Sequence, residues 1–293
     1  MSTVAKEMGI KRLVTGDIGI EIEVEGKNLP TMIKYWNNEQ DGSLQGAESK
    51  EYVLKRPMFL KEVESALDHL DSEYVRWKTI VDDTVRAGVH VHINCQQLTM
   101  TQLYNFMTIY LILEDVLVKW CGESRCGNLF CLRASDAEYI LTSIRRAAEG
   151  RRFKATFHTD NLRYASMNLK ALGDYGSLEF RAMRGTRDLK LIYIWAETLL
   201  GLREFAKQFN SPAEVVEAFS VQSPTRFMKN ALGTNYEIFS RDGQEKLLWE
   251  GVRNAQDIAF CADWSKFDPK MRKIGELEFP EDAQNVDEPD EDF

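Results

Sequence analysis

The feature that most constrains the fold is a segment in which apolar and acidic residues alternate strictly. In residues 17–25 (DIGIEIEVE), isoleucine and valine occupy one side, and Glu21, Glu23 and Glu25 occupy the other. A repeat of two residues places alternate side chains on opposite faces of a β-strand. The segment therefore predicts a strand with one face in a hydrophobic core and one face of carboxylates.

Two later segments alternate in the same way and predict further strands of such a sheet: residues 88–94 (GVHVHIN) and residues 177–183 (SLEFRAM). Their polar positions are His90 and His92 in the first, and Glu179 and Arg181 in the second. Residues 165–171 predict a strand that a Gly-Asp-Tyr-Gly turn at 173–176 joins to residues 177–183 as a hairpin.

Apolar residues at helical spacing dominate the rest of the chain. A short strand is predicted near residues 51–55, and a turn at residues 41–43. Helices are predicted after Pro57, from a cap at Thr99 to about residue 121, and at 135–148, 189–209, 212–219, 224–232 and 243–260. This order indicates an α+β domain over residues 1–275, with an antiparallel sheet backed by helices and a helical C-terminal third.

Charge is distributed unevenly, and this limits the classes of partner. The chain of 293 residues has a net charge of −9, but the segment 276–293 holds nine acidic residues and no basic one, which leaves the rest neutral. A neutral body argues against a dedicated duplex-DNA-binding protein. The tail predicts a disordered, solvated segment. Because it ends in Phe293 after three acids, docking to a basic groove of a partner protein is the alternative.

The compartment follows from what the sequence lacks. No apolar run is long enough for a membrane span, and the first residues do not resemble a secretory signal. Five cysteines without an export signal predict reduced thiols, and the five-residue spacing of Cys121, Cys126 and Cys131 makes zinc a minor alternative. We therefore expect a cytoplasmic protein that does not bind membranes.

The polar faces of the three predicted strands suggest a common site. If the strands share one sheet, carboxylates, imidazoles and a guanidinium gather on its open face. Carboxylate oxygens favour Mg²⁺ or Mn²⁺, and arginine pairs with phosphate. Each pair taken alone also fits a solvated sheet face, surface histidines or a simple ion pair between strands.

Six motifs in order give this pattern a family resemblance. They are GIEIEVEG (19–26), DGSL (41–44), Glu51 before Lys55-Arg56-Pro57, GVHVHIN (88–94), RYASMNL (163–169) and GSLEFRAMRGT (176–186). The set resembles the motif series of the amidoligases. These enzymes are similar to glutamate–cysteine ligases, within the glutamine synthetase superfamily of ATP-dependent carboxylate–amine ligases. The resemblance implies a glutamine-synthetase-like catalytic sheet.

The resemblance also implies roles for single residues. Metal ligands would be Glu21, Glu23, Glu51, His92 and Glu179; the nucleotide would contact His92, His90, Asn168 and Arg181; catalysis or substrate binding would involve Arg181, Glu51 and Arg163. The stretch 46–57 is longer and more basic than the usual short acidic strand, so Glu48 is an alternative to Glu51. The implied cofactors are ATP and Mg²⁺ or Mn²⁺.

Such a site implies a ligase that converts a carboxylate to an acyl phosphate and then joins it to an amine. The substrates would be small-molecule or peptide carboxylates and amines. A phosphotransferase on the same fold and a non-catalytic binding or scaffold protein are the alternatives. The sequence contains no Walker A motif and no GxGxxG fingerprint, so neither of those nucleotide-binding routes is supported.

Overall fold

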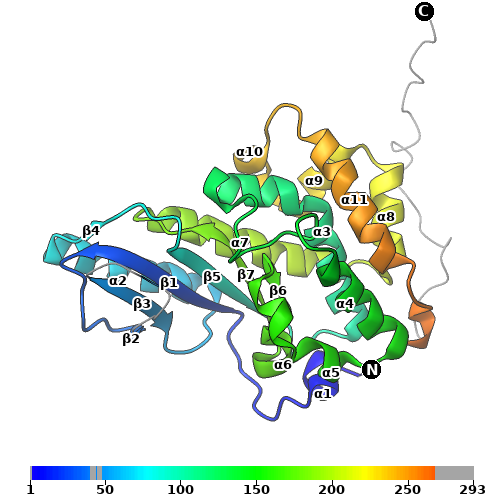
Figure 1. Ribbon diagram of the computed structural model, residues 1–293, viewed down its shortest axis with the longest axis horizontal. Coiled ribbons are helices and arrows are strands. Elements are labelled where there is room, and N and C mark those ends of the chain that lie inside the picture. The colour runs from blue at the N-terminus through cyan, green and yellow to red at the C-terminus, as the bar shows by residue number, and fades with distance from the viewer. Residues whose placement is uncertain (1, 40–43, 45–47, 268–293) are drawn as a thin grey trace, which may run out of the picture.

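The computed structural model describes residues 2–39, 44 and 48–267, and its centre is one antiparallel sheet (Figure 1). The strands run in the order β2-β3-β1-β5-β7-β6, and β4 pairs with β1 outside this path. Their bounds are β1 Ile18–Lys27, β2 Trp36–Glu39, β3 Ser49–Leu54, β4 Ile80–Val81, β5 Gly88–Asn94, β6 Met167–Asn168 and β7 Ser177–Arg184. The predicted α+β class is confirmed, and the three alternating segments lie side by side as β1, β5 and β7.

Helices make up most of the rest of the described chain. They are α1 Val4–Met8, α2 Leu60–Trp77, α3 Met100–Cys121, α4 Glu138–Gly150, α5 Phe153–Phe157, α6 Ala171–Tyr175, α7 Leu189–Ala206, α8 Pro212–Val221, α9 Pro224–Leu232, α10 Tyr236–Phe239 and α11 Glu245–Ala259. Short 3₁₀ turns include η1 Glu123–Arg125 and η2 Asp160–Tyr164. The helical C-terminal third is thus confirmed through residue 259.

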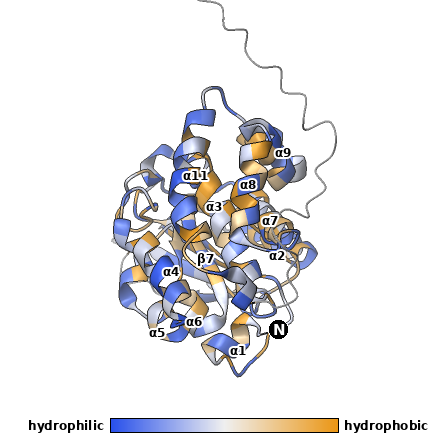
Figure 2. Cartoon of the chain, turned by 90° about the vertical axis from the view of Figure 1, so that its right-hand side faces the viewer, coloured by the Kyte–Doolittle hydropathy of each residue, from blue (hydrophilic) through white to orange (hydrophobic). Residues whose placement is uncertain are grey.

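The core lies between the apolar face of the sheet and the helices. The inward residues of β1, from Ile18 to Val24, are fully or almost fully buried, and α7 and α3 contact β5 and β7. Helix α3 is buried along nearly its whole length, because α7, α8 and α11 surround it. Figure 2 shows α3 as a largely hydrophobic ribbon, with hydrophilic turns on the outer helices α4 and α11. This arrangement leaves the carboxylate face of the sheet free to form a site.

The hairpin predicted for residues 165–183 is correct in its strand pairing but wrong in the turn that joins the two strands. The two strands do pair antiparallel, but β6 covers only Met167–Asn168, and helix α6 replaces the expected tight turn. The side chain of Asn168 accepts a hydrogen bond from the Lys170 N–H, which turns the chain out of the strand. Gly176 then ends α6 with φ of 71°, a left-handed conformation that favours glycine.

The helix expected from residue 135 begins later, at Glu138. Asp136 instead accepts hydrogen bonds from the backbone N–H and the Nε of Arg133, and this closes a turn before the helix. The cap at Thr99 is confirmed, since its hydroxyl accepts from the Gln102 N–H. Neither the turn predicted at 41–43 nor the acidic tail 276–293 lies within the described residues. In the part of the chain that is described, no helix is both long and apolar enough to cross a membrane.

Candidate active site

The register of the strands brings the predicted polar residues into neighbouring rows. Glu21 of β1 lies opposite His90 of β5, and His92 lies opposite Glu179 of β7. Glu179 also lies opposite Asn168 of β6, and on the other side of β1 Glu23 lies opposite Glu51 of β3. Cross-strand partners have Cβ atoms about 5 Å apart, so the predicted groups form one continuous cluster.

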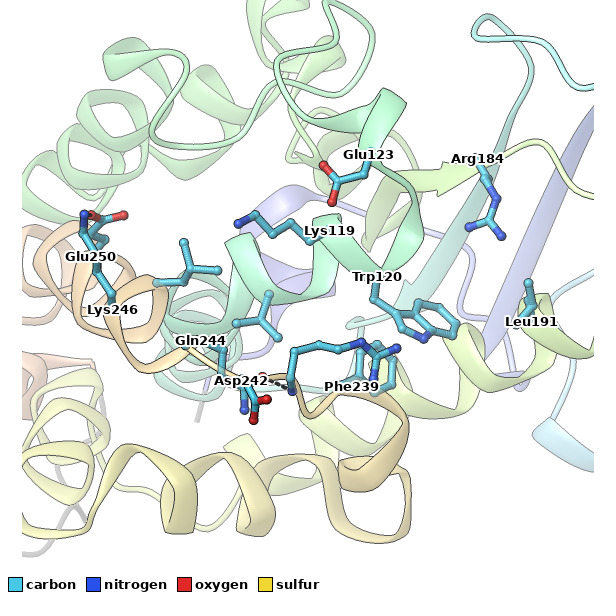
Figure 3. A pocket seen from close by; sticks show the side chains of 14 residues that line it. Lys119, Trp120, Glu123, Arg184, Leu191, Phe239, Asp242, Gln244, Lys246 and Glu250 are labelled. Atoms are coloured by element: carbon cyan, nitrogen blue, oxygen red, sulfur yellow. Dashed lines mark hydrogen bonds and ion pairs between the residues drawn. The ribbon is translucent and has the colours of Figure 1, made fainter.

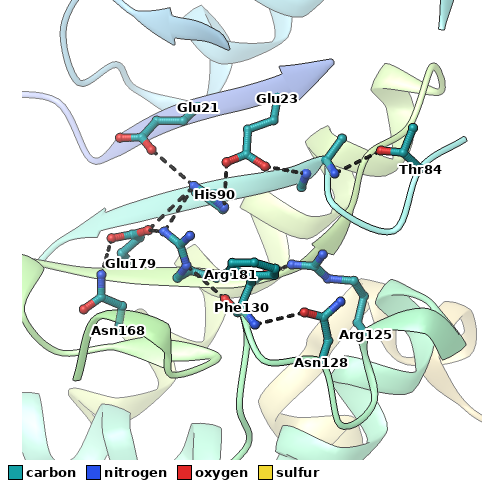
Figure 4. A network of polar contacts seen from close by, with 12 residues as sticks. Glu21, Glu23, Thr84, His90, Arg125, Asn128, Phe130, Asn168, Glu179 and Arg181 are labelled. Atoms are coloured by element: carbon teal, nitrogen blue, oxygen red, sulfur yellow. Dashed lines mark hydrogen bonds and ion pairs between the residues drawn. The ribbon is translucent and has the colours of Figure 1, made fainter. Parts of the chain in front are cut away.

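The two histidines hold the first glutamate between them, and Figure 4 shows the contact with His90. His90 Nδ1 lies 3.2 Å from Glu21 Oε2, and His92 Nε2 lies 3.2 Å from Glu21 Oε1. His90 Nε2 lies 3.7 Å from Glu23 Oε1, and its Nδ1 lies 3.7 Å from Glu179 Oε1. His90 is almost fully buried and therefore forms the centre of the cluster.

The charges of the cluster perturb its titration. Burial works against the ionised form of Glu21, but hydrogen bonds from His90 and His92 outweigh it and hold the pKa of Glu21 well below its usual range. Burial would likewise raise the pKa of Glu179, and the charges of His92 and Arg181 lower it overall. The pKa of His92 is raised despite burial, because Glu21 and Glu179 stabilise its imidazolium form.

Arg181 is fixed at a bend in β7. The register of β5 and β7 shifts between Val89 and Val91, so that Arg181 and Ala182 of β7 both lie opposite the single residue His90 of β5, which is a bulge in β7. Bulges of this kind redirect side chains and are common beside active sites. Arg181 forms an ion pair with Glu179, and its Nε donates to the carbonyl of Phe130 at 3.2 Å. Its guanidinium is thus held toward His90 and the carboxylates (Figure 4).

Two cavities meet at Glu21. The larger, about 900 Å³, lies between the segment before β1, the end of β3 and helix α6, and includes Lys55, His92 and Tyr175. The smaller, about 190 Å³, is lined by Glu21, Glu23, Glu51, Arg86, His90, Arg125, Phe130, Arg163, Tyr164 and Arg181. Since Glu21 lines both, a group bound in one cavity can meet a group bound in the other at this residue.

The remaining predicted residues lie at or beside the smaller cavity, except Glu48. Glu51 lines the smaller cavity, whereas Glu48 is exposed and accepts a hydrogen bond from the backbone N–H of Asn28. Arg163 lies at the same cavity on η2, with its guanidinium 5.7 Å from the ring centre of Tyr164. Asn168 donates to Glu179 at 2.5 Å, so its amide orients that carboxylate.

The donor set fits a divalent cation. One ligand atom each from Glu21, His92 and Glu179 lies within 4.8 Å of the others, and Glu23 and Glu51 add further carboxylates across the smaller cavity. Carboxylate oxygens with one imidazole suit Mn²⁺, and the carboxylates alone suit Mg²⁺.

Comparison with known families identifies the group to which the chain is related. The sequence model of a family described as "Putative amidoligase enzyme" matches residues 36–203, more than half of the chain. The chain belongs to this amidoligase family. Among curated proteins, none matches the sequence. The match includes β3, β5, β6 and β7, while β1 precedes it, so Glu21 and Glu23 join the site through strand pairing.

The amidoligase site also contains residues that the strand patterns did not indicate. Arg125 of η1 is buried, and its Nη2 donates to the carbonyl of Arg181 at 2.7 Å. Gly88 allows this approach, because a Cβ there would lie 3.2 Å from Arg125 Nη2 and 3.5 Å from Glu23 Oε2. The Gly88 N–H donates to Glu23 at 2.7 Å. Arg125 lies in a segment without periodicity, so no sequence pattern indicates it. Gly88 is the first residue of the predicted strand 88–94, so the alternating pattern already placed it beside the polar residues.

A third cavity of the amidoligase lies away from these residues. It measures about 660 Å³ and is lined by the end of α3 and by residues around α10 and α11, including Trp120, Phe239 and Arg241 (Figure 3). Its acidic and basic side chains are mixed: Glu123, Asp242 and Glu250 against Lys119, Arg184, Arg241 and Lys246. No residue of the predicted site lines it, so this cavity is separate from the candidate site at Glu21.

Proposed function

We propose that this amidoligase is an ATP- and Mg²⁺-dependent ligase that joins a carboxylate to an amine through an acyl phosphate. The observation that supports it best is the junction at Glu21, where a nucleotide-sized cavity meets a small cavity rich in arginine. Ligand pockets of several hundred Å³ suit molecules of nucleotide size. The smaller cavity suits the acid whose carboxylate is to be activated.

Each cavity offers charges that match its proposed occupant. Lys11, Arg12, Lys55 and Arg56 line the larger cavity and favour a polyphosphate. Arg163 and Arg181 line the smaller one and favour the carboxylate and the transferring phosphoryl group. Glu21, Glu23, His92 and Glu179 would hold Mg²⁺, which when bound would offset negative charge on the phosphates.

The residues of the chain then have separate tasks. Arg181, held by Glu179 and Phe130, would orient the transferring phosphoryl group and neutralise part of its charge. Arg163 at the cavity wall would bind the acid. Glu51, on the same wall as Glu23, would accept the proton that the attacking amine loses. These roles require the acid and the phosphate to meet beside Glu21.

The experiment measures ADP release with Mg²⁺, ATP and a panel of acids and amines, with mass spectrometry of the products. The wild type should release ADP and form a condensation product that lacks one water. Glu21→Gln should lower the rate by about 1,000-fold, as loss of a central electrostatic group does. Glu48→Gln is the matched control and should retain wild-type activity. A phosphorylated product without condensation would instead establish a phosphotransferase.

A further inference from the structure

Another buried carboxylate lies behind the candidate active site, on helix α3. Glu114 is 4% exposed, and both of its oxygens are hydrogen-bonded. The hydroxyl of Ser166 donates to its Oε1 at 2.7 Å, and the backbone N–H of Ala134 donates to its Oε2 at 2.8 Å. Glu114 therefore joins α3 to two segments that are separated in sequence from it and from each other.

Both segments lead to Arg181. The carbonyl of Ser166 accepts the Arg181 backbone N–H at 2.8 Å. Ala134 belongs to the segment 126–136, which we call the rim loop, and the carbonyl of Phe130 in this loop accepts from Arg181 Nε at 3.2 Å. The Ser166 N–H also donates to the carbonyl of Leu132 at 2.7 Å. The backbone and the side chain of Arg181 thus rest on the two segments that Glu114 joins.

The groups around Glu114 leave it largely without a cationic partner. Tyr110 contacts Ser166 at 2.8 Å, and Asp115 adds a like charge from the same helix. Arg133 of the rim loop binds Asp115 and Asp136, so its charge is already shared, and Glu250 of α11 acts on Asp115. Burial outweighs the hydrogen bonds from Ser166 and Ala134 and raises the pKa of Glu114 to about 7.

We propose that Glu114 is a positioning residue that makes the hold of the rim loop on Arg181 depend on pH. When the loop opens and water reaches Glu114, the carboxyl returns toward its ordinary acidity and releases its proton. By linkage, opening becomes more favourable as pH rises between the exposed and the buried pKa, by about 300-fold in all. The closed loop is therefore most stable at acidic pH and loses this part of its stability as pH rises to about 7.

The primary test is hydrogen exchange of the rim-loop amides in the whole protein, corrected for intrinsic exchange, between pH 5 and 8.5. The wild type should lose protection at residues 126–136 as pH rises. Glu114→Gln cannot ionise, and its amide can still accept from Ala134 and donate to Ser166, so its protection should stay constant. Glu214→Gln, which replaces another buried helical glutamate bound to Asn210, is the matched control and should follow the wild type. Equal pH dependence in wild type and Glu114→Gln would overturn the proposal.

A second variant tests the sign if Glu114→Gln does not fold. Ser166→Ala removes a donor that favours ionised Glu114 and leaves the carbonyl that holds Arg181 in place. The loss of protection should then shift to higher pH, and an unchanged midpoint would contradict the proposal. The effect on catalysis rests on the proposed function: as pH rises toward 7, the loop contribution should lower kcat for ADP release in wild type and then level off, and this component should be absent in Glu114→Gln. Because hydrogen exchange needs no substrate, the proposal can fail or hold independently of the ligase activity.

Discussion

Two groups of buried carboxylates in this amidoligase respond to burial in opposite ways. On the sheet face, hydrogen bonds and charges from His90, His92 and Arg181 keep the pKa values of Glu21 and Glu179 low. Behind the sheet, Glu114 receives hydrogen bonds from a hydroxyl and a backbone N–H, and its pKa is raised to about 7. Glu179 and Glu114 are both buried, so the opposite directions of their pKa shifts come from their partners, and Glu21 is partly buried beside the same histidines.

This contrast separates a ligand site from a structural element that can respond to pH. Carboxylates that stay ionised in a cluster of exchangeable partners can accept a metal ion in place of an imidazolium. A carboxylate surrounded by fixed neutral donors has no cationic partner that a metal ion could replace. Its ionisation instead changes the stability of the segments that cover it. The predictions below alter one group at a time and compare the response of the other.

The largest effect should come from removing the permanent cation of the sheet-face cluster. Arg181→Met leaves Glu179 buried without its permanently charged partner, and loss of one partner of a buried pair costs about 3–5 kcal/mol. Urea unfolding at pH 7 measures it. Arg163→Met, at an exposed position of the same cavity, should change the free energy of unfolding by about 0.5 kcal/mol or less. Equal losses in the two variants would show that the Glu179 pair is not the source.

The next effect concerns Glu114 and the pH dependence of global stability. Its folded pKa lies above its unfolded value, so its stabilising contribution is fully present below pH 4.5 and is lost as pH rises through about 7. The shift corresponds to about 3 kcal/mol. Relative to Glu114→Gln, the wild type should therefore lose about this amount between pH 4.5 and 8.5, as followed by urea unfolding. Parallel curves for the two proteins would show that Glu114 does not titrate in this range.

The two groups also differ in how far the sequence could predict them. Alternation placed Glu21, His90, His92, Glu179 and Arg181 on one face, because a two-residue period fixes which side a strand residue faces. Glu114 stands in an almost wholly buried helix, where no amphipathic pattern distinguishes one face. Arg125 and Phe130 come from segments without periodicity, and their positions depend on contacts with α3 and β7 that sequence spacing does not encode.

The shape of the fold shows the same limit. The sequence predicts the bounds of strands β1 and β5 to within two residues. Their own alternation of apolar and polar residues determines both that they are strands and which side chains face the core. The connection from β6 to β7 was predicted incorrectly, because the Asn168 side chain and the left-handed Gly176 favour a helical turn over a hairpin. Local side-chain bonds to the backbone decided that connection, and they depend on neighbours as much as on residue type.

A smaller effect should appear in metal binding to the sheet-face cluster. The pKa of His92 is raised by Glu21 and Glu179, so below it a metal ion must displace a proton from the imidazole. Without nucleotide, the affinity for Mn²⁺ should increase by about tenfold per pH unit up to that pKa and then level off. Calorimetry or electron paramagnetic resonance measures this. His92→Gln should bind Mn²⁺ more weakly with a shallower slope, whereas an unchanged slope would assign the proton to another group.

The smallest effect should leave both groups of carboxylates as they are. Thr99→Ala removes the hydroxyl that caps α3, at the end of the helix remote from Glu114 and outside the sheet-face cluster. Loss of such a cap costs about 1 kcal/mol. Because no titrating group changes its surroundings, the loss should be the same at pH 5 and pH 8, and Mn²⁺ affinity should be unaffected. A loss that varied with pH would mean that the stability of α3 and the ionisation of Glu114 are coupled along the helix.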